Sequence, residues 1–231
     1  FWLKGYEPGY LLGTDNLGRD ILSRIIYGSR VSITVGVLAV LLSGVLGTAI
    51  GLLSGFYSVV EHVMMRIADI QLSFPTILLA LAIVAVVGGG LDNLIYVLGI
   101  TGWVPYARVI RSEVLSIRSS DFVVAAKTIG AGDMRVLFRH ILPNIFAPAM
   151  TIATFQVASA IIAESSLSFL GLGVPVDVPS WGNMLSQGQM YLSSAWWISV
   201  FPGLSIMMIV LAINLLGDRL RDIFDPKTRH N

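Results

Sequence analysis

The chain contains no cysteine, and only 13% of its 231 residues carry a charge. Without cysteine it forms neither a disulfide nor a thiolate metal site, and its histidines, His62, His140 and His230, are not spaced as metal ligands. Its formal net charge of +1 gives no basic field that would bind nucleic acid. Hydrophobic residues, by contrast, make up 55% of the chain. This composition is typical of an integral membrane protein.

Four long stretches contain no Asp, Glu, Lys or Arg: residues 31–57, 70–91, 141–163 and 178–217. Each is longer than the ~18 residues that indicate a transmembrane helix. A fifth, weaker stretch precedes Arg108, whose side chain can extend to the membrane surface. We therefore expect an all-α, polytopic membrane bundle with five spans, at roughly 31–57, 70–89, 93–111, 145–170 and 195–216.

Lys and Arg indicate which side each loop faces, because they concentrate on the cytoplasmic side of membrane proteins. If the N-terminus is outside, eleven of the fifteen Lys and Arg residues lie in cytoplasmic segments or at the span ends leading into them, and 171–194 contains none. The four exceptions, Lys4, Arg19, Arg24 and Arg30, all precede the first span. We therefore expect an external segment at 1–30, a transmembrane domain at 31–231, a cytoplasmic loop at about 112–144 and an external loop at about 171–194.

The start of the chain raises a separate expectation. It begins with Phe1 and shows no secretory signal pattern, whereas an external N-terminus normally requires something upstream to place it there. We expect one further span before this chain in the native protein. Within residues 14–30, apolar residues recur at helical spacing, which predicts an interfacial helix in the outer leaflet. An extension of the following span is the alternative.

Two patterns concern helix packing rather than chemistry. Gly47, Gly51 and Gly55 are four residues apart, so they share one helix face on which a second backbone can approach closely. Pro75 leaves one carbonyl without its helical partner and predicts a kink in the second span.

Polar residues inside spans are costly and are therefore functional candidates. The three candidates are Glu164, Gln156 and Asn214. At ~1.5 Å per residue from Asn144, Glu164 lies ~30 Å along its helix, near the outer boundary. It is either a functional carboxylate or a water-facing group at a helix end, and the sequence leaves both open.

Residues 121–143, between the third and fourth spans, are basic, amphipathic and interrupted by glycine. Apolar residues recur at helical spacing on both sides of Gly130, which stands where a left-handed cap residue is expected. Asp133 is placed to cap the second helix. We therefore expect two short helices joined at Gly130 on the cytoplasmic side.

The first of these helices is expected to present a small-residue surface, Ala125 and Ala126, to another protein. Phe122, Ala126 and Ile129 share one of its faces. A short helix held in a partner's groove transmits the partner's rigid-body motion to the spans attached at both of its ends. A passive surface loop is the alternative that the residues leave open.

The same stretch resembles the signature of ABC-importer permeases, in which Glu-Ala-Ala is followed after three residues by Gly and nine residues later by Ile-x-Leu-Pro. Val124 here replaces the glutamate and His140 the isoleucine. The positions that match at the family spacing are Ala125, Ala126, Gly130, Leu142 and Pro143.

Other stretches resemble the C-type membrane subunit of peptide and nickel permeases of the dipeptide/oligopeptide class, and together they cover nearly the whole chain. These stretches are LGTDNLGRDILSR (12–24), ESSLSFLGLGVP (164–175), PSWGNML (179–185), AWW (195–197) and LLGDRLRDIFDPK (215–227).

The resemblance implies the type I ABC-importer permease fold and ATP-driven import of di- or oligopeptides by alternating access. It implies the plasma (inner) membrane of a bacterium or archaeon, with lipid around the spans. The implied protein partners are a second homologous permease completing a heterodimer, two cytoplasmic ATPase subunits and an external substrate-binding protein.

The resemblance also implies a division of labour in which this chain is not an enzyme. ATP and Mg are expected on the ATPase subunits, and this chain, which has no Walker-type phosphate loop, is expected to hold no catalytic residue, cofactor or metal. The expected ATPase-docking residues are Ala125, Ala126, Gly130 and Asp133. The residues expected to face the partner permease or the binding protein are Trp181, Gly182 and Met184.

Within the family, the solute is alternatively nickel or another metal chelate.

Three further alternatives belong to other classes of protein. An ion-coupled secondary transporter needs an intramembrane coupling site, for which Glu164 is the sole ionisable candidate. An intramembrane protease needs a histidine facing a serine within a span, whereas His62 and His140 lie at cytoplasmic positions. A purely structural membrane subunit is disfavoured by residues 121–143.

Overall fold

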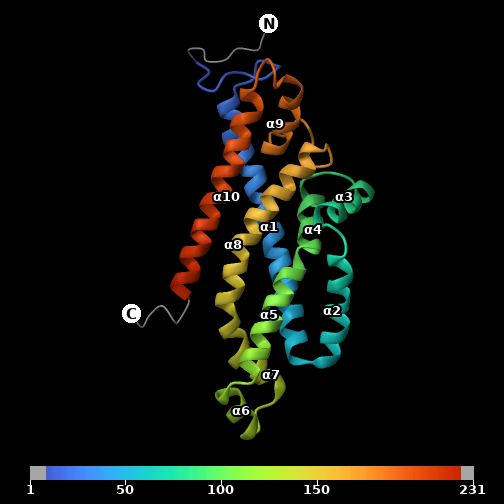
Figure 1. Cartoon of the computed structure of the whole chain (residues 1–231), viewed down its shortest axis with the longest axis vertical. Coiled ribbons are helices and arrows are strands. Elements are labelled where there is room, and N and C mark those ends of the chain that lie inside the picture. The colour runs from blue at the N-terminus through green and yellow to red at the C-terminus, as the bar shows by residue number, and fades with distance from the viewer. Residues whose placement is uncertain (1–8, 225–231) are drawn as a thin grey trace.

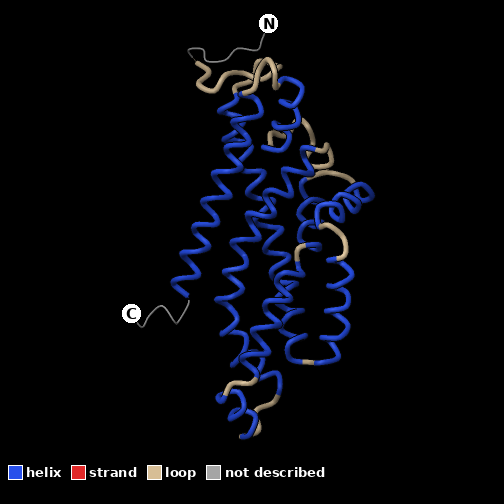
Figure 2. The backbone as a smooth tube through the Cα atoms, viewed as in Figure 1, coloured by secondary structure: helices blue, strands red, loops and turns tan. Residues whose placement is uncertain are grey.

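The computed structural model describes residues 9–224, and within this range the regular structure is helical apart from an isolated β-bridge between Thr14 and Asp20. The helices form one elongated bundle with α9 at one end and α6 and α7 at the other (Figure 1). We call these the α9 end and the α6 end. Loops lie mainly at these two ends and around α3 (Figure 2).

The chain runs along the bundle in alternating directions. α1 leads from the α9 end towards the α6 end, α2 turns back, and α4 and α5 run beside α1 to the α6 end, from which α8 returns and α10 descends again (Figure 1). The helices are α1 (Ile21–Phe56), α2 (Ser58–Leu72), α3 (Thr76–Val87), α4 (Leu91–Thr101), α5 (Trp103–Arg118), α6 (Asp121–Thr128), α7 (Asp133–Arg135), a π-helical turn (Val136–Ile141), α8 (Leu142–Phe169), α9 (Trp181–Gly188), a 3₁₀ turn (Gln189–Tyr191) and α10 (Trp197–Phe224).

Three helices in the described range are long and apolar enough to cross a membrane: α1, the continuous helix Asp133–Phe169 and α10. The pair α2 and α3 meets the same measure together, with an 89° bend between them. That bend lies at Pro75, where a kink was predicted. The expected span at 93–111 falls on α4 and α5, which meet at Gly102 and have only 11 and 16 residues. Up to four of the five expected spans therefore correspond to such a helix or helix pair.

α1 corrects one expectation about the start of the chain. The Asp20 side chain accepts a hydrogen bond from the Ser23 backbone N–H at 2.9 Å, and the helix then runs unbroken for 36 residues. The separate interfacial helix predicted at 14–30 is therefore wrong. Nothing between Ile21 and the first span stops the helix, and propagation adds one backbone hydrogen bond per residue.

The glycine face of α1 brings α5 into close contact, as predicted. An added Cβ would lie 2.5 Å from the Trp103 carbonyl oxygen at Gly47 and 2.7 Å from the Ala107 carbonyl oxygen at Gly51. A side chain at either position would therefore push the two backbones apart. This packing holds α5 along α1 and so places residues 121–143 beyond the ends of both helices.

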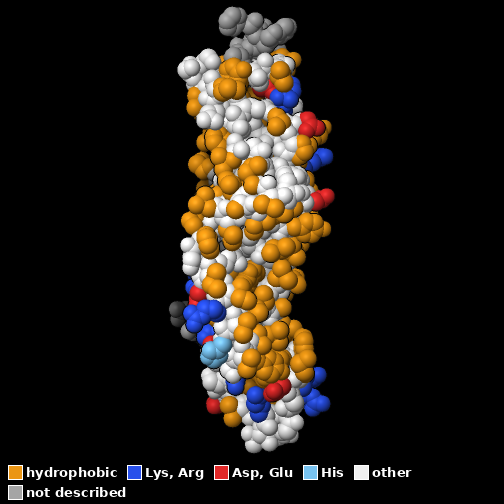
Figure 3. All heavy atoms as spheres, turned by 90° about the vertical axis from the view of Figure 1, so that its right-hand side faces the viewer, with side chains coloured by type: hydrophobic (Ala, Val, Ile, Leu, Met, Phe, Trp, Pro, Cys, Tyr) orange, Lys and Arg blue, Asp and Glu red, His pale blue; other side chains and the backbone are white. Residues whose placement is uncertain are grey.

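The outer surface is largely apolar, as a membrane environment requires. Figure 3 shows hydrophobic side chains over the middle of one face and most of the charged side chains of that face in its lower third. Exposed leucine, isoleucine, valine and methionine side chains occur on α1, α3, α8 and α10. In a soluble protein so extensive an apolar surface would not remain exposed.

Candidate functional site

The α6 end contains the two short helices that the sequence predicted, joined at Gly130. Gly130 has φ +88°, in the left-handed region. Its N–H donates to the Lys127 carbonyl at 3.0 Å, and the N–H of Ala131 donates to the Ala126 carbonyl at 3.0 Å. This pair of bonds is a Schellman cap, which closes a helix through a glycine in this conformation. The joint at Gly130 is therefore confirmed.

Backbone conformation, rather than space, requires glycine at this joint. An added Cβ at Gly130 would meet no atom within 4 Å. A β-branched side chain at φ +88° would nevertheless be strongly disfavoured. A substitution at Gly130 therefore tests the backbone conformation without introducing a steric clash.

The second helix starts differently from the expectation. Asp133 was predicted as its cap, but Gly132 occupies the capping position and Asp133 is the first helical residue. The Asp133 carboxylate instead lies 3.5 Å from Lys127 Nζ, across the joint. Both side chains are substantially exposed, so this ion pair contributes little stability.

The structure shows which face of α6 is buried. Val123 and Ala126 are buried, whereas Phe122, Ala125 and Ile129 are exposed. Of the two alanines predicted to face another protein, only Ala125 is therefore accessible in this chain. The inward face is decided by contact with α1, α5 and the π-helical turn, through a cluster that includes Phe56, Val114, Val123, Val136, Leu137 and Ile141.

Arg118 and Lys127 attach the α6 end to the last turn of α1. Arg118 donates from Nη1 to the Phe56 carbonyl oxygen at 3.0 Å, and Lys127 Nζ lies 4.6 Å from the centre of the Phe56 ring. This attachment was not predicted from the sequence. Its signal was present in part, since a basic residue at the end of α5 is well placed to reach unpaired carbonyls at a helix C-terminus.

A π-helical turn, which no sequence pattern predicted, connects α7 to α8. Leu137 and Ile141 point into the core, while Phe138 remains exposed on the same turn. Such turns occur in helices frequently at functional sites. Here the turn lies between the Gly130 joint and the long helix α8.

Several apolar side chains are exposed at this end, and we call them together the α6-end face. Within the described residues nothing covers it, and Ile129 at its tip is 87% exposed. Exposed apolar side chains at the end of a bundle are candidates for contact with another protein. The residues of the face are Phe122, Val124, Ile129, Met134 and Phe138.

The predicted polar candidates within spans do not form one site. Glu164 and Gln156 are both on α8, roughly 12 Å apart along its axis at 1.5 Å per residue, and Asn214 lies half-buried on α10. Gln156 Nε2 is 3.5 Å from the Gly102 carbonyl oxygen, a marginal hydrogen bond. No group of three or more His, Cys, Asp or Glu side chains suited to hold a metal occurs among residues 9–224.

Glu164 is neither a surface group nor a water-facing helix end. Its side chain is fully buried in the chain. Ser168 Oγ donates to Glu164 Oε1 at 2.8 Å, and Ser165 Oγ donates to Oε2 at 3.3 Å. Hydroxyl groups of α8 itself therefore satisfy the carboxyl group where this helix packs against α9.

Trp181, Gly182 and Met184, expected to face another protein, are buried inside the chain. Trp181 Nε1 donates to the Ile25 carbonyl oxygen at 3.1 Å, and Met184 packs with Ile21 and Ile198. These side chains therefore attach α9 to α1 and α10, which corrects the expectation for them. Whether the loop around them faces a partner stays a prediction.

Known proteins resemble this chain over most of its length. The family model described as "Binding-protein-dependent transport system inner membrane component" matches residues 44–230. The Di/tripeptide transport system permease protein DppC of Pseudomonas aeruginosa is 44% identical over 230 residues, which cover 99% of this chain and 76% of the relative.

Other relatives and one solved structure also match most of the chain. The Dipeptide transport system permease protein DppC of Haemophilus influenzae is 41% identical and the Glutathione transport system permease protein GsiD of Pectobacterium atrosepticum 40%. They cover 99% and 98% of this chain, and it covers 78% and 75% of them. An inward-facing structure of the MetNI methionine ABC transporter matches with TM-score 0.74 at 17% identity, covering 89% of this chain and 98% of that one. This last similarity shows the fold alone.

Proposed function

We propose a function from one premise: the chain belongs to the family of binding-protein-dependent transport system inner membrane components. It is a multi-pass membrane protein with the permease fold of an ABC importer. The observation that carries its function is the 40–44% identity, over nearly the whole chain, to permeases named for di- and tripeptides, dipeptides and glutathione. The chain is a permease subunit that moves peptides across the membrane.

The finer proposal concerns how transport is driven. The chain is non-catalytic, and separate ATPase subunits bind and hydrolyse ATP with Mg. It pairs with a second permease to form the pathway, and an external binding protein delivers the peptide. On this view the α6 end is cytoplasmic and the α9 end is external, in agreement with the distribution of Lys and Arg.

The α6-end face is the proposed ATPase-docking surface. Its exposed apolar side chains suit a groove in a partner protein. The Gly130 joint and the contact of α6 with Phe56 connect that surface to α1, and the π-helical turn connects it to α8. Motion of the docked subunit would therefore reach two membrane helices at once.

Reconstitution tests the transport proposal directly. Proteoliposomes containing this permease, its partner permease and both ATPases are expected to accumulate a labelled dipeptide only with ATP and binding protein present. A nickel chelate is expected not to compete. Uptake driven by an ion gradient without ATP would overturn the proposal in favour of a secondary transporter, and preferential uptake of the chelate would reassign the solute.

Site-specific crosslinking tests the docking surface. A photoreactive residue at Ile129 is expected to crosslink to an ATPase subunit, because this side chain is 87% exposed at the tip of the face. Val86 on α3 is equally exposed, at 87%, and provides the matched control, which is expected to crosslink to no ATPase. An equal yield at both positions would contradict docking through the α6-end face.

A further inference from the structure

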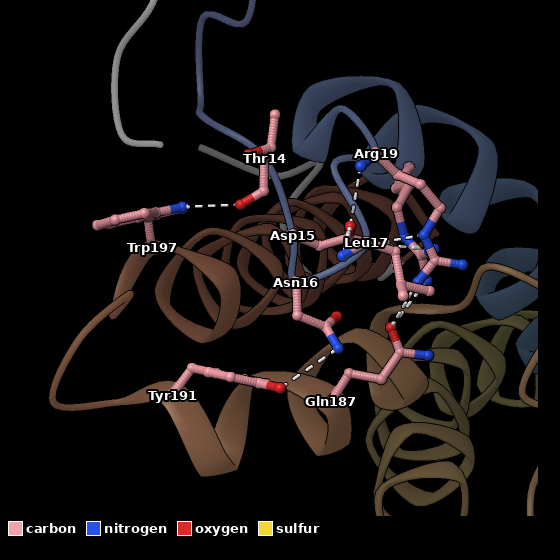
Figure 4. A network of polar contacts seen from close by, with 9 residues as sticks. Thr14, Asp15, Asn16, Leu17, Arg19, Gln187, Tyr191 and Trp197 are labelled. Carbon is pink, nitrogen blue, oxygen red and sulfur yellow. Dashed lines mark hydrogen bonds and ion pairs between the residues drawn. The ribbon is translucent and has the colours of Figure 1, made fainter. Parts of the chain in front are cut away.

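The α9 end contains a polar network that the proposed function does not use. It joins the loop before α1, residues 13–20, to α9 and to the start of α10 (Figure 4). The two partners of each hydrogen bond across this boundary are separated by at least 156 residues in sequence. The network therefore connects the first helix of the described chain to its last two.

Asp15 is the centre of this network and is only 1% exposed. Its Oδ1 accepts hydrogen bonds from the backbone N–H groups of Leu17 and Arg19, each at 2.9 Å. Its Oδ2 accepts from Arg19 Nε at 2.6 Å and lies 3.4 Å from Arg24 Nη1. One carboxylate thus orients both guanidinium groups.

Gln187 on α9 receives both of these guanidinium groups. Arg19 Nη2 and Arg24 Nη2 each donate to Gln187 Oε1 at 3.2 Å. An amide oxygen has two lone pairs and is able to accept both bonds. The two arginines and one aspartate leave a net positive charge, which favours an acceptor oxygen in front of them.

Three further hydrogen bonds cross the same boundary. Trp197 Nε1 donates to the Thr14 carbonyl oxygen at 3.1 Å, and Asn16 Nδ2 donates to Tyr191 Oη at 3.4 Å. Trp181 Nε1 donates to the Ile25 carbonyl oxygen. Each bond has one partner on the loop or first turns of α1 and the other on residues 181–197.

Such a network gives fixed geometry more than it gives stability. Burying charged groups carries a desolvation cost, and apolar side chains of similar size often stabilise a fold equally well. A buried carboxylate that orients two guanidinium groups onto one amide oxygen allows only a narrow set of arrangements. The network therefore suits a junction that must keep its shape while other parts of the molecule move.

We propose that Asp15 is a positioning residue and that Asp15, Arg19, Arg24 and Gln187 form an external clasp. The clasp joins the loop before α1 and the first turn of α1 to α9, so that the outer ends of α1, α9 and α10 move as one body when the importer changes conformation. This proposal rests on the proposed function, because it assigns the clasp a part in the transport cycle.

Distance measurements in the assembled transporter test the clasp. The chain has no cysteine of its own, so spin labels are introduced at Leu17→Cys and Met190→Cys, both exposed, in a complex whose other subunits lack cysteine. The distance distribution is measured in nanodiscs without nucleotide and after trapping with ATP and vanadate. We expect the same narrow distribution in both states.

Two substitutions at Gln187 distinguish the effect of its acceptor oxygen from the effect of its side-chain volume. Gln187→Met keeps the volume, removes the acceptor and is expected to broaden the distribution, because one hydrogen bond to a charged group is equivalent to about a tenfold change in an equilibrium constant. Gln187→Glu keeps an acceptor oxygen and is expected to retain the narrow distribution. Gln187→Met is also expected to lower the peptide transported per ATP, whereas Gln189→Ala, at an exposed neighbour, leaves it unchanged.

Several outcomes would overturn the clasp. They are a wild-type distance that changes between the two states, an unchanged distribution in Gln187→Met, and a Gln187→Glu variant that behaves like Gln187→Met. If neither variant assembles, Gln187 serves folding alone and the clasp proposal is overturned. If only the Gln187→Glu variant assembles, the result supports the clasp proposal. If the wild-type complex takes up no peptide, the proposed function fails while the distances still decide the clasp.

Discussion

The two ends of the bundle satisfy their side chains in opposite ways. At the α9 end, charged and polar side chains find their partners within the chain. Asp15 is buried among its partners, and Trp181 and Trp197 both donate hydrogen bonds to backbone carbonyls. At the α6 end, apolar side chains such as Ile129 and Phe138 point outward, and the one ion pair across the Gly130 joint is exposed.

We relate this difference to two properties, the rigidity of the α9 end and the availability of the α6 end to a partner protein. An end whose polar groups are internally paired has a fixed shape and does not require a partner for its own stability. An end that leaves apolar side chains uncovered gains from a partner that buries them. We call the α9 end, whose charged groups are paired within the chain, the self-contained end, although Leu17 and Met190 there are exposed, and we call the α6 end the incomplete end. The long helices α1 and α8 connect the two ends, whereas α10 starts at the α9 end and stops short of the α6 end (Figure 1).

The largest expected effect comes from breaking the incomplete end at its joint. Gly130→Val places a β-branched residue at φ +88°, which costs more than the 1–2 kcal/mol of an ordinary left-handed residue. We expect peptide uptake to fall by about tenfold or more. Gly130→Asn is the control, because asparagine tolerates this conformation and is expected to retain most of the uptake. Normal uptake by the valine variant would remove the mechanical role of the joint.

The next effect tests the self-contained end through its central carboxylate. Asp15→Asn leaves the guanidinium groups of Arg19 and Arg24 without their counter-charge, one of them nearly buried. Breaking a buried pair costs about 3–5 kcal/mol, and the partial exposure of Arg19 reduces this to about 2 kcal/mol. Thermal unfolding of the purified complex measures the loss. The exposed Asp177 at the same end gives the control, and Asp177→Asn is expected to change stability by less than about 0.5 kcal/mol.

Glu164→Gln is expected to show a smaller, purely structural effect. In Glu164→Gln the amide oxygen still accepts from Ser168, so we expect a loss below about 1 kcal/mol and normal uptake. In Glu164→Ala the buried serine hydroxyls lose their acceptor, and we expect a loss of about 2 kcal/mol. Stability and uptake of both variants are measured together. A normally stable Gln variant that fails to transport would show that the ionisable group itself takes part in transport.

The smallest effect is expected at the exposed ion pair of the incomplete end. Lys127→Ala removes the contact with Asp133 and the approach to the Phe56 ring. Because the pair is solvent-exposed, we expect the unfolding free energy to change by less than about 0.5 kcal/mol. A loss comparable to that of Asp15→Asn would erase the contrast between the two ends.

The main features of the α6 end could be predicted because they are local. The left-handed conformation at Gly130 and the break between α2 and α3 at Pro75 both follow from the residue type at that position. The glycines four residues apart likewise predicted that a second helix approaches α1 closely, and the structure identifies that helix as α5. Patterns of this kind depend on backbone conformation and helical periodicity, which neighbouring residues determine.

The inward and outward faces could not be predicted in the same way. Ala126 is buried and Phe122 is exposed although the two were placed on one helix face, because α1 and α5 decide which side of α6 is covered. The inward positions of Trp181 and Met184 depend in the same manner on α1 and α10. Helical periodicity shows which residues share a face, but not which face meets another element.

From the sequence by itself came the membrane character of the chain, the approximate positions of most spans and the joint at Gly130, since hydropathy and backbone preference act over short stretches. The tertiary structure alone decided that Glu164 is buried among serines, that Asp15 reaches Gln187 through two arginines, and that the α6-end face is left uncovered. These features join residues far apart in the chain, and their distances follow only from how the helices pack.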